Sequence, residues 1–360
     1  MRNAKVRVLA VCAAGVLALA ACSTNSPSSS SAAAKGDGKG YKIALLLPET
    51  AVARYDGKDK PYFQAKLKKL CASCTLLYAN ANSSADTQQQ QAQSMLTQGA
   101  DVLVVDPVDG VAAGSIVVAA KSKNVPVVAY DRLIKSPDLS YVISNDYEQV
   151  GKLQAQALVD KLKADKVSPS EGGIIMMNGA TTDNNAGLIK KGALGVINNS
   201  GYKVLSSTDT WDPSAAQSWV SGQNTRFGKK IVGVYSANDG NAGAAIAALK
   251  AAGVSPLPPV TGLDASLAGL QAILAGNQYM TTYNSFQKEA ETAATVAYDL
   301  ARGVTPKTSA TVDGHPATLN PPVAVTAPDI QSTVIRDGFW SVSQLCTSAY
   351  KAACAEHDIK

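Results

Sequence analysis

Residues 230–252 read KIVGVYSANDGNAGAAIAALKAA, and this stretch contains the unit from which the fold can be predicted. An apolar run at 230–235 is followed by a polar cluster at 236–240 and then by an alanine-rich helical stretch at 241–252. An unbroken apolar run indicates a strand buried on both faces, and such strands alternate with helices in parallel α/β sheets. The stretch therefore predicts a strand, a polar turn and a helix, in the order of a βαβ unit.

The same succession recurs along most of the chain. Further helical stretches are expected at 85–98, 147–163 and 287–302. Apolar runs of strand character lie at 41–47, 75–78, 102–105, 125–129, 141–143, 173–177, 203–205, 230–235, 259–262, 279–283 and 323–325. This is too many strands for one compact open sheet. About 320 residues follow position 40, where the expected N-terminal signal and tether end, and this is enough for two domains of ordinary size. We predict an α/β fold with more than one parallel sheet.

Polar side chains gather at the ends of eight of these apolar runs. Asp131 and Arg132 follow the fourth run, for example, and Asp183 and Asn185 follow the sixth. A single pair of this kind usually marks a turn or a helix cap, and Asp183 and Asp239 are expected to cap helices as well. Their repetition favours a binding site instead, because ligands bind at the carboxyl ends of the strands in open α/β sheets.

The residue types in these clusters are those that bind a polyol. Each sugar hydroxyl is both a donor and an acceptor, a carboxylate accepts, a guanidinium donates as a rigid fork, and an amide does both. Aromatic faces cover the apolar C–H patches of a sugar ring. The clusters are rich in Asp, Asn and Arg with a few aromatics, so we expect a sugar ligand.

The N-terminus has the character of an export signal. Three basic residues precede an apolar run at 8–21, which is shorter than the roughly 20 residues of a spanning helix. The run ends Leu19-Ala20-Ala21-Cys22, which resembles the lipobox of bacterial lipoproteins, where cleavage leaves a diacylated cysteine. Residues 1–21 are then a lipoprotein signal peptide, and 22–40, composed almost entirely of small and polar residues, a flexible tether. The alternative is an ordinary signal peptide with a cysteine there by chance.

The cysteines fit an exported protein. Beyond Cys22 and one cysteine in the signal, four remain, grouped as Cys71 with Cys74 and Cys346 with Cys354. Two local pairs in an exported chain indicate disulfides. The alternative for Cys71 and Cys74 is a redox motif, but the pair follows the expected end of a helix, where the helix dipole disfavours a thiolate.

Charge and histidine content argue against other classes of protein. The formal net charge of +5 falls to +2 once the three positive charges of the signal are removed, too little for a nucleic-acid binder. The two histidines are His315, in an expected loop, and His357 in the tail, and no G-x-S-x-G elbow occurs. An exported glycosidase remains an alternative, because paired carboxylates can perform acid–base chemistry. No cofactor and no metal is predicted.

The order of the motifs resembles a known family. Ala53-Arg54-Tyr55, Ala129-Tyr130-Asp131-Arg132, Thr182-Asp183-Asn184-Asn185-Ala186, Ser236-Ala237-Asn238-Asp239-Gly240, Gly262-Leu263-Asp264-Ala265 and Tyr279-Met280-Thr281-Thr282-Tyr283 are similar, in this order, to the xylose-binding branch of type I periplasmic sugar-binding proteins. The resemblance covers about Tyr41 to Gly338. It implies a monomer of two similar α/β lobes with parallel sheets, joined by three crossovers and holding the sugar between them. The lobes would comprise 41–145 with 285–320, and 146–284 with 321–360.

The same resemblance implies a set of ligand-binding residues. The expected members are Arg54, Tyr55, Asp131, Arg132, Asp183, Asn185, Trp211, Asn238, Asp264 and Asn284. Asp131 and Arg132 would form a carboxylate–guanidinium pair on the ring hydroxyls, and Trp211 a stacking face. The sequence departs from the pattern at Leu263, where glutamine is usual, and at Asn284, where lysine is usual, so a different or larger sugar than xylose is expected to fit.

The function implied is that of a receptor. The chain would capture a monosaccharide outside the cytoplasm and deliver it to an ABC permease with its cytoplasmic ATPase. Cys22 would anchor it to the outer face of the cytoplasmic membrane. One alternative is a receptor that presents the sugar to a membrane sensor, and another is an exported carbohydrate-active enzyme. Sugar-responsive repressors share the fold but begin with a helix-turn-helix, where this chain has a signal and a tether.

Overall fold

The computed structural model describes residues 40–50 and 54–360. The expected signal peptide, the tether up to residue 39 and the lipidation site Cys22 lie outside the described residues. Within those residues, no helix combines the length and the apolar character needed to cross a membrane.

The first sheet has seven strands in the order β10-β11-β5-β4-β3-β1-β2. Every pairing is parallel except that of β10 with β11. The strands are β1 (Lys42–Leu47), β2 (Thr75–Asn80), β3 (Val102–Val105), β4 (Val127–Tyr130), β5 (Tyr141–Asn145), β10 (Ala310–Val312) and β11 (His315–Asn320).

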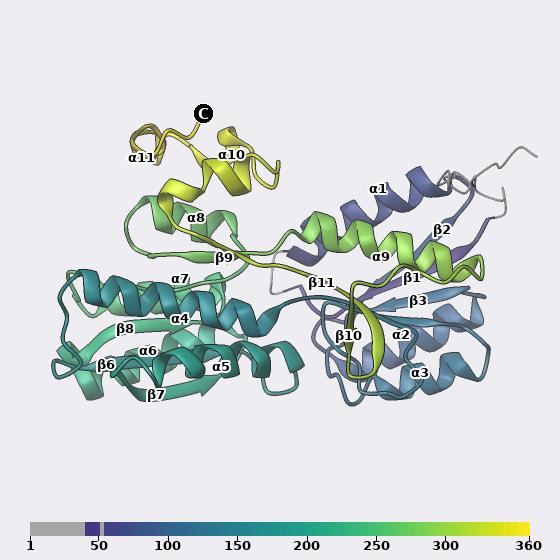
Figure 1. The fold of residues 1–360 in the computed structure, drawn as a ribbon, viewed down its shortest axis with the longest axis horizontal. Helices are drawn as coiled ribbons and strands as arrows, with labels where there is room; N and C mark the ends of the chain where they lie inside the picture. The colour runs from purple at the N-terminus through teal and green to yellow at the C-terminus, as the bar shows by residue number, and fades with distance from the viewer. Residues whose placement is uncertain (1–39, 51–53) are drawn as a thin grey trace, which may run out of the picture. The chain divides into compact units, whose positions relative to one another are not determined.

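Helices cover both faces of this sheet, which explains why its central strands are apolar throughout. Alternate residues of β1 enter two different cores, Ile43 with α1 (Lys60–Leu70) and α9 (Phe286–Ala301), and Ala44 with α2 (Ala85–Thr97) and α3 (Gly114–Lys121). Figure 1 shows α1 and α9 on one side of the sheet and α2 and α3 on the other. A strand buried on both faces needs no polar alternation.

The second sheet is parallel, in the order β7-β6-β8, and also lies between two helical layers. Its strands are β6 (Gly173–Asn178), β7 (Lys203–Asp209) and β8 (Ile231–Ser236). Helices α4 (Tyr147–Ala164) and α5 (Asn184–Ile197) share one core with β6, and α6 (Pro213–Phe227) and α7 (Asp239–Ala251) share the other. Beyond them lie α8 (Leu267–Leu274) and an antiparallel pair, β9 (Thr281–Tyr283) with β12 (Val323–Val325).

Side-chain caps define where most of these helices begin. An oxygen of the residue preceding the helix accepts a hydrogen bond from a backbone N–H of the first turn, which would otherwise lack a partner. The capping residues are Ser84, Asp146, Asp183, Asp212, Asn238, Ser266 and Ser285.

Two sequence expectations about this part of the fold are wrong. Residues 259–262 form no strand, and Val260 makes only an isolated bridge to Val234. His315 is expected in a loop but begins β11. This strand pairs with β5, which is far away in the sequence, and the local sequence HPATLN does not indicate that pairing. Its Pro316 sits where β11 faces the short β10, at the margin of the sheet, where a missing N–H is tolerated.

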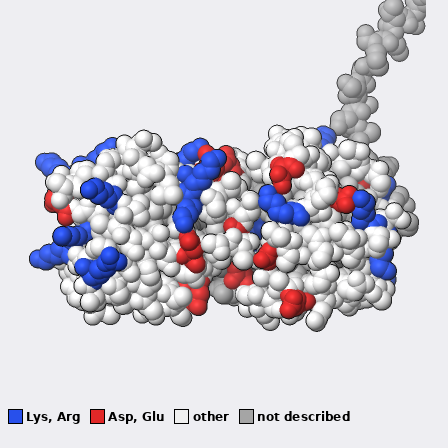
Figure 2. Space-filling view, turned by 90° about the horizontal axis from the view of Figure 1, so that it is seen from below, with Lys and Arg blue, Asp and Glu red and all other residues white. Residues whose placement is uncertain are grey.

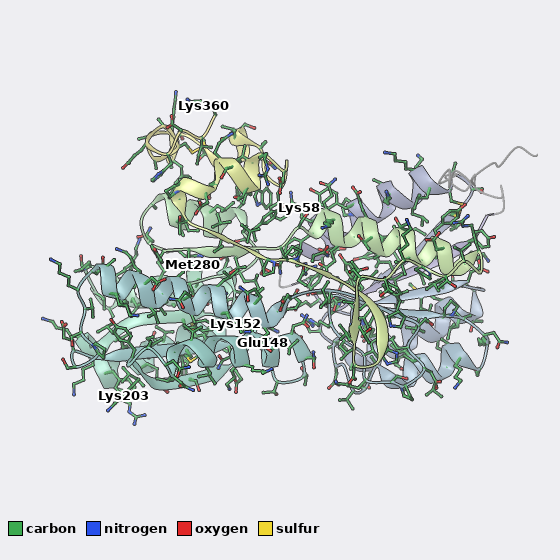
Figure 3. The ribbon with its side chains drawn as sticks, viewed as in Figure 1. Lys58, Glu148, Lys152, Lys203, Met280 and Lys360 are labelled. Atoms are coloured by element: carbon green, nitrogen blue, oxygen red, sulfur yellow. A yellow bond between two sulfur atoms is a disulfide. The ribbon has the colours of Figure 1, made fainter. Side chains whose placement is uncertain are left out.

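The surface carries charges of both signs. On the face shown in Figure 2 they are scattered singly or in small mixed groups, and most of that face is uncharged. Exposed ion pairs such as Glu148 with Lys152, one turn apart on α4 and labelled in Figure 3, contribute little to stability.

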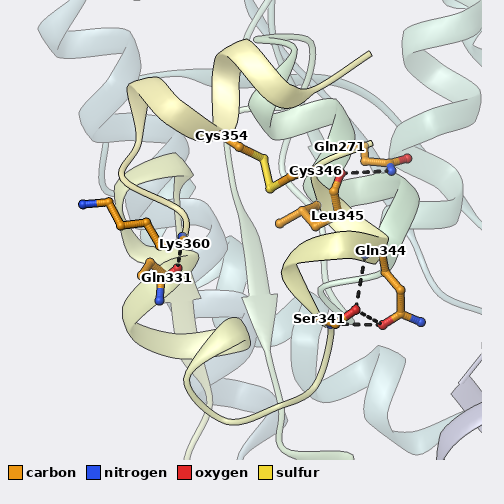
Figure 4. Close-up of a disulfide and its surroundings, with 8 residues drawn as sticks. All are labelled: Gln271, Gln331, Ser341, Gln344, Leu345, Cys346, Cys354 and Lys360. Atoms are coloured by element: carbon orange, nitrogen blue, oxygen red, sulfur yellow. Dashed lines mark hydrogen bonds between the residues drawn. A yellow bond between two sulfur atoms is a disulfide. The ribbon is translucent and has the colours of Figure 1, made fainter. Parts of the chain in front are cut away.

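The C-terminal segment folds onto α8 and β9. After β12 come the short helices η3 (Ala327–Asp329), η4 (Gln331–Ile335), α10 (Val342–Leu345) and α11 (Lys351–Glu356), and a disulfide joins Cys346 to Cys354 (Figure 4). Buried Phe339 and Leu345 enter the same core as Leu270 of α8. The other disulfide, between Cys71 and Cys74, lies immediately after α1. Two further short helices are η1 (Tyr55–Asp59) and η2 (Gly228–Lys230).

Candidate ligand pocket

The polar strand ends of the two sheets converge on one small pocket. It has a volume of about 40 Å³. Nine of the ten residues expected to bind the ligand line it, namely Arg54, Tyr55, Asp131, Arg132, Asp183, Asn185, Trp211, Asn238 and Asp264, together with Tyr147, Ile189 and Leu263.

Arg54 is held by three carboxylates. It lies directly before η1, a one-turn π-helix of a kind frequently found at functional sites. Its guanidinium donates to both carboxylate oxygens of Asp59 at 3.1 and 2.7 Å, to Asp131 at 2.9 Å and to Glu289 at 3.1 Å. The guanidinium carbon of Arg54, Cζ, lies 3.8 Å from the centre of the Phe286 ring. Burial alone would lower the pKa of Arg54, but the three carboxylates raise it, so the side chain is a fixed cation.

Asp131 joins residues that belong to different sheets. Besides Arg54, it accepts hydrogen bonds on Oδ1 from the hydroxyl of Tyr147 and from Nδ2 of Asn185, the latter at 3.3 Å. The Asn185 amide also donates to the backbone carbonyl of Asp131 at 3.1 Å. Asp131 has φ of +61°, in the left-handed region that few non-glycine residues occupy and that often marks functional sites.

Arg132 bonds to a different set of partners. Its Nη2 donates to Glu49 and to the hydroxyl of Tyr55, both at 3.1 Å, and its Nε lies 3.2 Å from Asp183. Asp131 and Arg132, expected to act together on the ring hydroxyls of a sugar, are not joined to each other by an ion pair in the described part of the chain. Asp131 pairs with Arg54, and Arg132 pairs with Asp183. Asp131 is itself in the left-handed conformation, and these two consecutive residues have different partners.

The second sheet contributes Asp183 and Trp211. As expected, Asp183 caps α5, accepting from the backbone N–H of Asn185 at 2.8 Å. Its other oxygen accepts from Nε1 of Trp211 at 3.0 Å, which fixes the indole at the pocket. Gly179 makes room for that ring, since a Cβ there would lie 2.0 Å from Cζ2 of Trp211.

The residue that caps α7 is Asn238 and not, as expected, Asp239. Asn238 caps α7 through Oδ1, which accepts from the backbone N–H of Asn241 at 2.9 Å, while also lining the pocket. Asp239, expected to cap, instead accepts from the backbone N–H of Ser266 and from Nε2 of Gln278, both at 2.8 Å. It thereby joins the start of α7 to the start of α8.

Asp264 is half-buried and conformationally unusual. Its φ is +98°, far from the values a non-glycine residue prefers, and its backbone N–H donates to the backbone carbonyl of Thr282. Burial raises the pKa of its carboxyl to about 7. Such a group in a pocket is typical of functional sites.

Asn284 does not line this pocket. It is buried at the end of β9, and both polar atoms of its amide lack a hydrogen-bond partner within the described residues. The expected enlargement of the pocket by this residue therefore rests on no contact seen in the structure. Leu263, the other departure, does line the pocket.

The expected set of ligand-binding residues omits several buried acids that surround the two guanidiniums. These are Glu49, Asp59, Asp106 and Glu289. Burial raises the pKa of Asp106 and of Glu289 well above their usual values, and the guanidiniums of Arg132 and Arg54 oppose this shift. Glu49 and Asp106 stand at the polar ends of β1 and β3, where such residues are expected, whereas Glu289 lies within α9, where its sequence neighbours give no signal.

Parallel α/β sheets that direct their polar strand ends into one shared pocket define a class of solute receptors. The comparisons with known proteins agree. The family model described as periplasmic binding protein domain matches residues 43–305, and the chain belongs to this family.

Individual relatives agree with this assignment. The chain is 36% identical to a D-xylose-binding periplasmic protein of Escherichia coli, over 85% of this chain and 93% of the relative. It is 34% identical to a protein of the same description from Haemophilus influenzae, over 84% and 91%. A carbohydrate transporter solute-binding protein of Chloroflexus aurantiacus, solved with D-glucose, superimposes with a TM-score of 0.77 at 25% identity, covering 85% of this chain and 98% of that one.

These findings confirm two of the sequence predictions. The α/β periplasmic binding protein fold, with two mostly parallel sheets, is the fold class expected. Family membership also confirms that the chain is a receptor for a solute and not an enzyme.

Proposed function

We propose that this protein captures a monosaccharide, xylose or a related pentose or hexose, outside the cytoplasm and delivers it to the permease of an ABC importer. The observation that supports this most strongly is the pocket itself. Two guanidiniums, three carboxylates, two amides and an indole face one small cavity at the strand ends of two sheets.

The bonds across this cavity indicate which groups a sugar would engage. Arg132 reaches Asp183 at 3.2 Å, and Asn185 reaches Asp131 at 3.1 to 3.3 Å. A sugar hydroxyl that donates to one carboxylate while accepting from a guanidinium or amide satisfies the same groups. Charge-assisted hydrogen bonds of this kind are stronger than neutral ones.

The class of sugar is supported by the relatives and by the pocket walls. Two relatives above 30% identity are described as D-xylose-binding, and a structural neighbour was solved with D-glucose. Leu263 and Ile189 give the pocket an apolar side that suits a ring face or an extra methylene group. A pentose and a hexose are therefore both ligands in this proposal.

The proposed membrane location of the receptor rests on its N-terminal sequence, and the proposed division into two lobes rests on the three crossovers that the family resemblance implies. Cys22 carries the lipid that anchors the receptor to the outer face of the cytoplasmic membrane, and residues 22–40 form the tether. The two lobes comprise 41–145 with 285–320, and 146–284 with 321–360. Removing the acyl site with Cys22→Ala is expected to abolish fatty-acid labelling and membrane retention, and equal labelling of this variant would contradict the anchor.

Calorimetric titration with xylose, glucose, galactose and ribose tests the ligand class. We expect saturable binding of at least one of these sugars without turnover. Asp131→Ala should weaken binding more than tenfold, because truncating one partner of a buried charged pair costs about 2–5 kcal/mol. Asp160→Ala, at an exposed position on α4, is the matched control. Unchanged affinity in a folded Asp131→Ala variant would mean that the sugar binds elsewhere.

A further inference from the structure

A second, larger pocket adjoins the candidate ligand pocket. The two share Arg54, Trp211, Asn238 and Asp264 as lining residues. The second pocket has a volume of about 420 Å³, against about 40 Å³ for the first. A volume of 420 Å³ lies within the range of small-molecule sites, so the second pocket is large enough for a ligand group of its own.

Its outer wall is aromatic and comes from the C-terminal segment. The Phe339 ring packs against Tyr283, Phe286 and Trp340, with centroid separations of 5.3 to 5.5 Å. Nε1 of Trp340 donates to the backbone carbonyl of Ala265 at 2.9 Å, and the side chain stays partly exposed at the pocket. The indole is therefore held in place while part of its surface is free to contact a ligand.

Lys58 reaches the same wall from η1. Its Nζ donates to the backbone carbonyl of Phe339 at 2.5 Å and lies 3.8 Å from the centre of the Trp340 ring (Figure 3 labels Lys58). Burial lowers the pKa of Lys58, and none of the ion pairs within the described residues includes it. Its ammonium has three donors, so it can still donate to a ligand oxygen.

We infer that this second pocket binds the second ring of a disaccharide whose first ring occupies the candidate ligand pocket. This inference rests on the proposed function. Trp340, with the Lys58 ammonium over one face of its ring, supplies apolar surface and a donor, and Ser266 and Gln271 supply further polar groups; this combination recognises a pyranose ring. Trp211, which lines both pockets, lies where two linked rings would meet.

The charges in the second pocket favour a neutral ring. Arg54 is already bonded to three carboxylates and has little capacity for an anionic group. Asp239 and Asp264 both line the second pocket, and their ionised forms offset the positive charge of Lys58, so no net attraction for an acidic sugar remains. A neutral disaccharide needs no such attraction and uses the aromatic wall.

The three tryptophans of the chain provide the test. Trp340 lines only the second pocket, Trp211 lines both, and Trp219 of α6 packs in a core away from both. Xylobiose, cellobiose and maltose would be titrated against their monosaccharides by calorimetry and by tryptophan fluorescence. We expect at least one disaccharide to bind at least as tightly as its monosaccharide. The part of its fluorescence change that exceeds the change produced by the monosaccharide should disappear in Trp340→Phe and persist in Trp219→Phe, because Trp211 reports on both sugars.

Affinity measurements on truncated variants complete the test. Trp340→Ala should weaken the disaccharide at least tenfold and the monosaccharide less than twofold, and Lys58→Met should show the same selectivity without removing an aromatic ring. Circular dichroism would verify that each variant is folded. Monosaccharide binding with no disaccharide binding, or equal losses for both, would overturn the second subsite and leave the proposed function intact. Failure of every sugar to bind the folded wild type would overturn the proposed function itself.

Discussion

At the scale of single residues, Asn238 serves a helix and a pocket at once. Its oxygen caps α7, and its side chain lines both pockets. Serine caps helices about as well as asparagine but lacks the amide donor. We therefore expect Asn238→Ser to lower sugar affinity roughly threefold to tenfold, the size of one neutral hydrogen bond, with the free energy of unfolding nearly unchanged.

Comparison with Asn238→Ala separates the two roles. Alanine removes the cap as well, so this variant should also lose about 1 kcal/mol of unfolding free energy. Calorimetry gives the affinities and urea unfolding gives the stabilities. If both variants keep wild-type affinity, Asn238 is a helix cap only.

Gly179 is a second residue whose role depends on a close approach. A Cβ at this position would lie 2.0 Å from Trp211, so Gly179→Ala must displace the indole from Asp183. We expect sugar affinity to fall more than tenfold and the Trp211 fluorescence to change. Gly187→Ala is the matched control, because Gly187 lies within α5, where an added Cβ would meet no atom within 4 Å and alanine favours the helix by about 1 kcal/mol. Equal behaviour of the two variants would contradict this account of Gly179.

At the scale of elements, the C-terminal segment depends on its disulfide. Its helices α10 and α11 have four and six residues, too short to be stable alone, and Cys346–Cys354 closes the loop between them. Closing a loop of this length stabilises a protein by about 2–3 kcal/mol in the chain-entropy treatment. We expect the double substitution Cys346→Ser and Cys354→Ser to lower the melting temperature in non-reducing buffer.

The disulfide Cys71–Cys74 provides the comparison for that experiment. It closes a shorter loop, so replacing both of its cysteines by serine should cost less, about 2 kcal/mol. Reductant should lower the melting temperature of the wild type further than that of the Cys346/Cys354 double variant. If the Cys346/Cys354 double variant has the same melting temperature as the wild type, the packing of Phe339 and Leu345 is sufficient to hold the C-terminal segment in place without the disulfide.

At the scale of the whole molecule, buried acids make stability depend on pH. Burial raises the pKa of Asp239 to about 6 and that of Asp264 to about 7, from usual values of 3.8. Between about pH 4 and pH 7 the folded chain therefore binds more protons than the unfolded chain, and the contribution of these groups to stability is lost as the pH rises through their folded pKa values. We expect the sugar-free protein to be more stable toward urea at about pH 5 than at about pH 8.

A substitution at Asp264 tests the origin of this dependence. Asp264→Asn removes one of these groups and should flatten the profile between about pH 4 and pH 7, as measured by urea unfolding in one buffer series. Asp160→Asn, at an exposed position, should leave the profile unchanged. Stability that rises with pH in the wild type, or an unaltered profile for Asp264→Asn, would contradict the assignment.

The α/β class, most of the strands and helices, and nine residues of the pocket lining follow from the amino-acid sequence alone. These features are local, because an apolar run, the polar residues after it and the helix that follows are close neighbours along the chain, as 230–252 show. In parallel sheets the carboxyl ends of such units meet at one edge, so strand-end residues such as Asp131 and Asp183 could be found without coordinates.

Which of these groups bond to one another depends on the way the chain folds back on itself. Arg54 and Glu289 are 235 positions apart and meet because α9 returns to the first sheet. Asp131 and Arg132 are adjacent in sequence yet bond to different partners, Asp131 to Arg54 and Arg132 to Asp183. The second pocket is likewise built from η1, the start of α8 and the C-terminal segment. Hydrogen bonds and packing act over a few ångströms, so their partners are fixed by the path of the chain in space and not by local sequence.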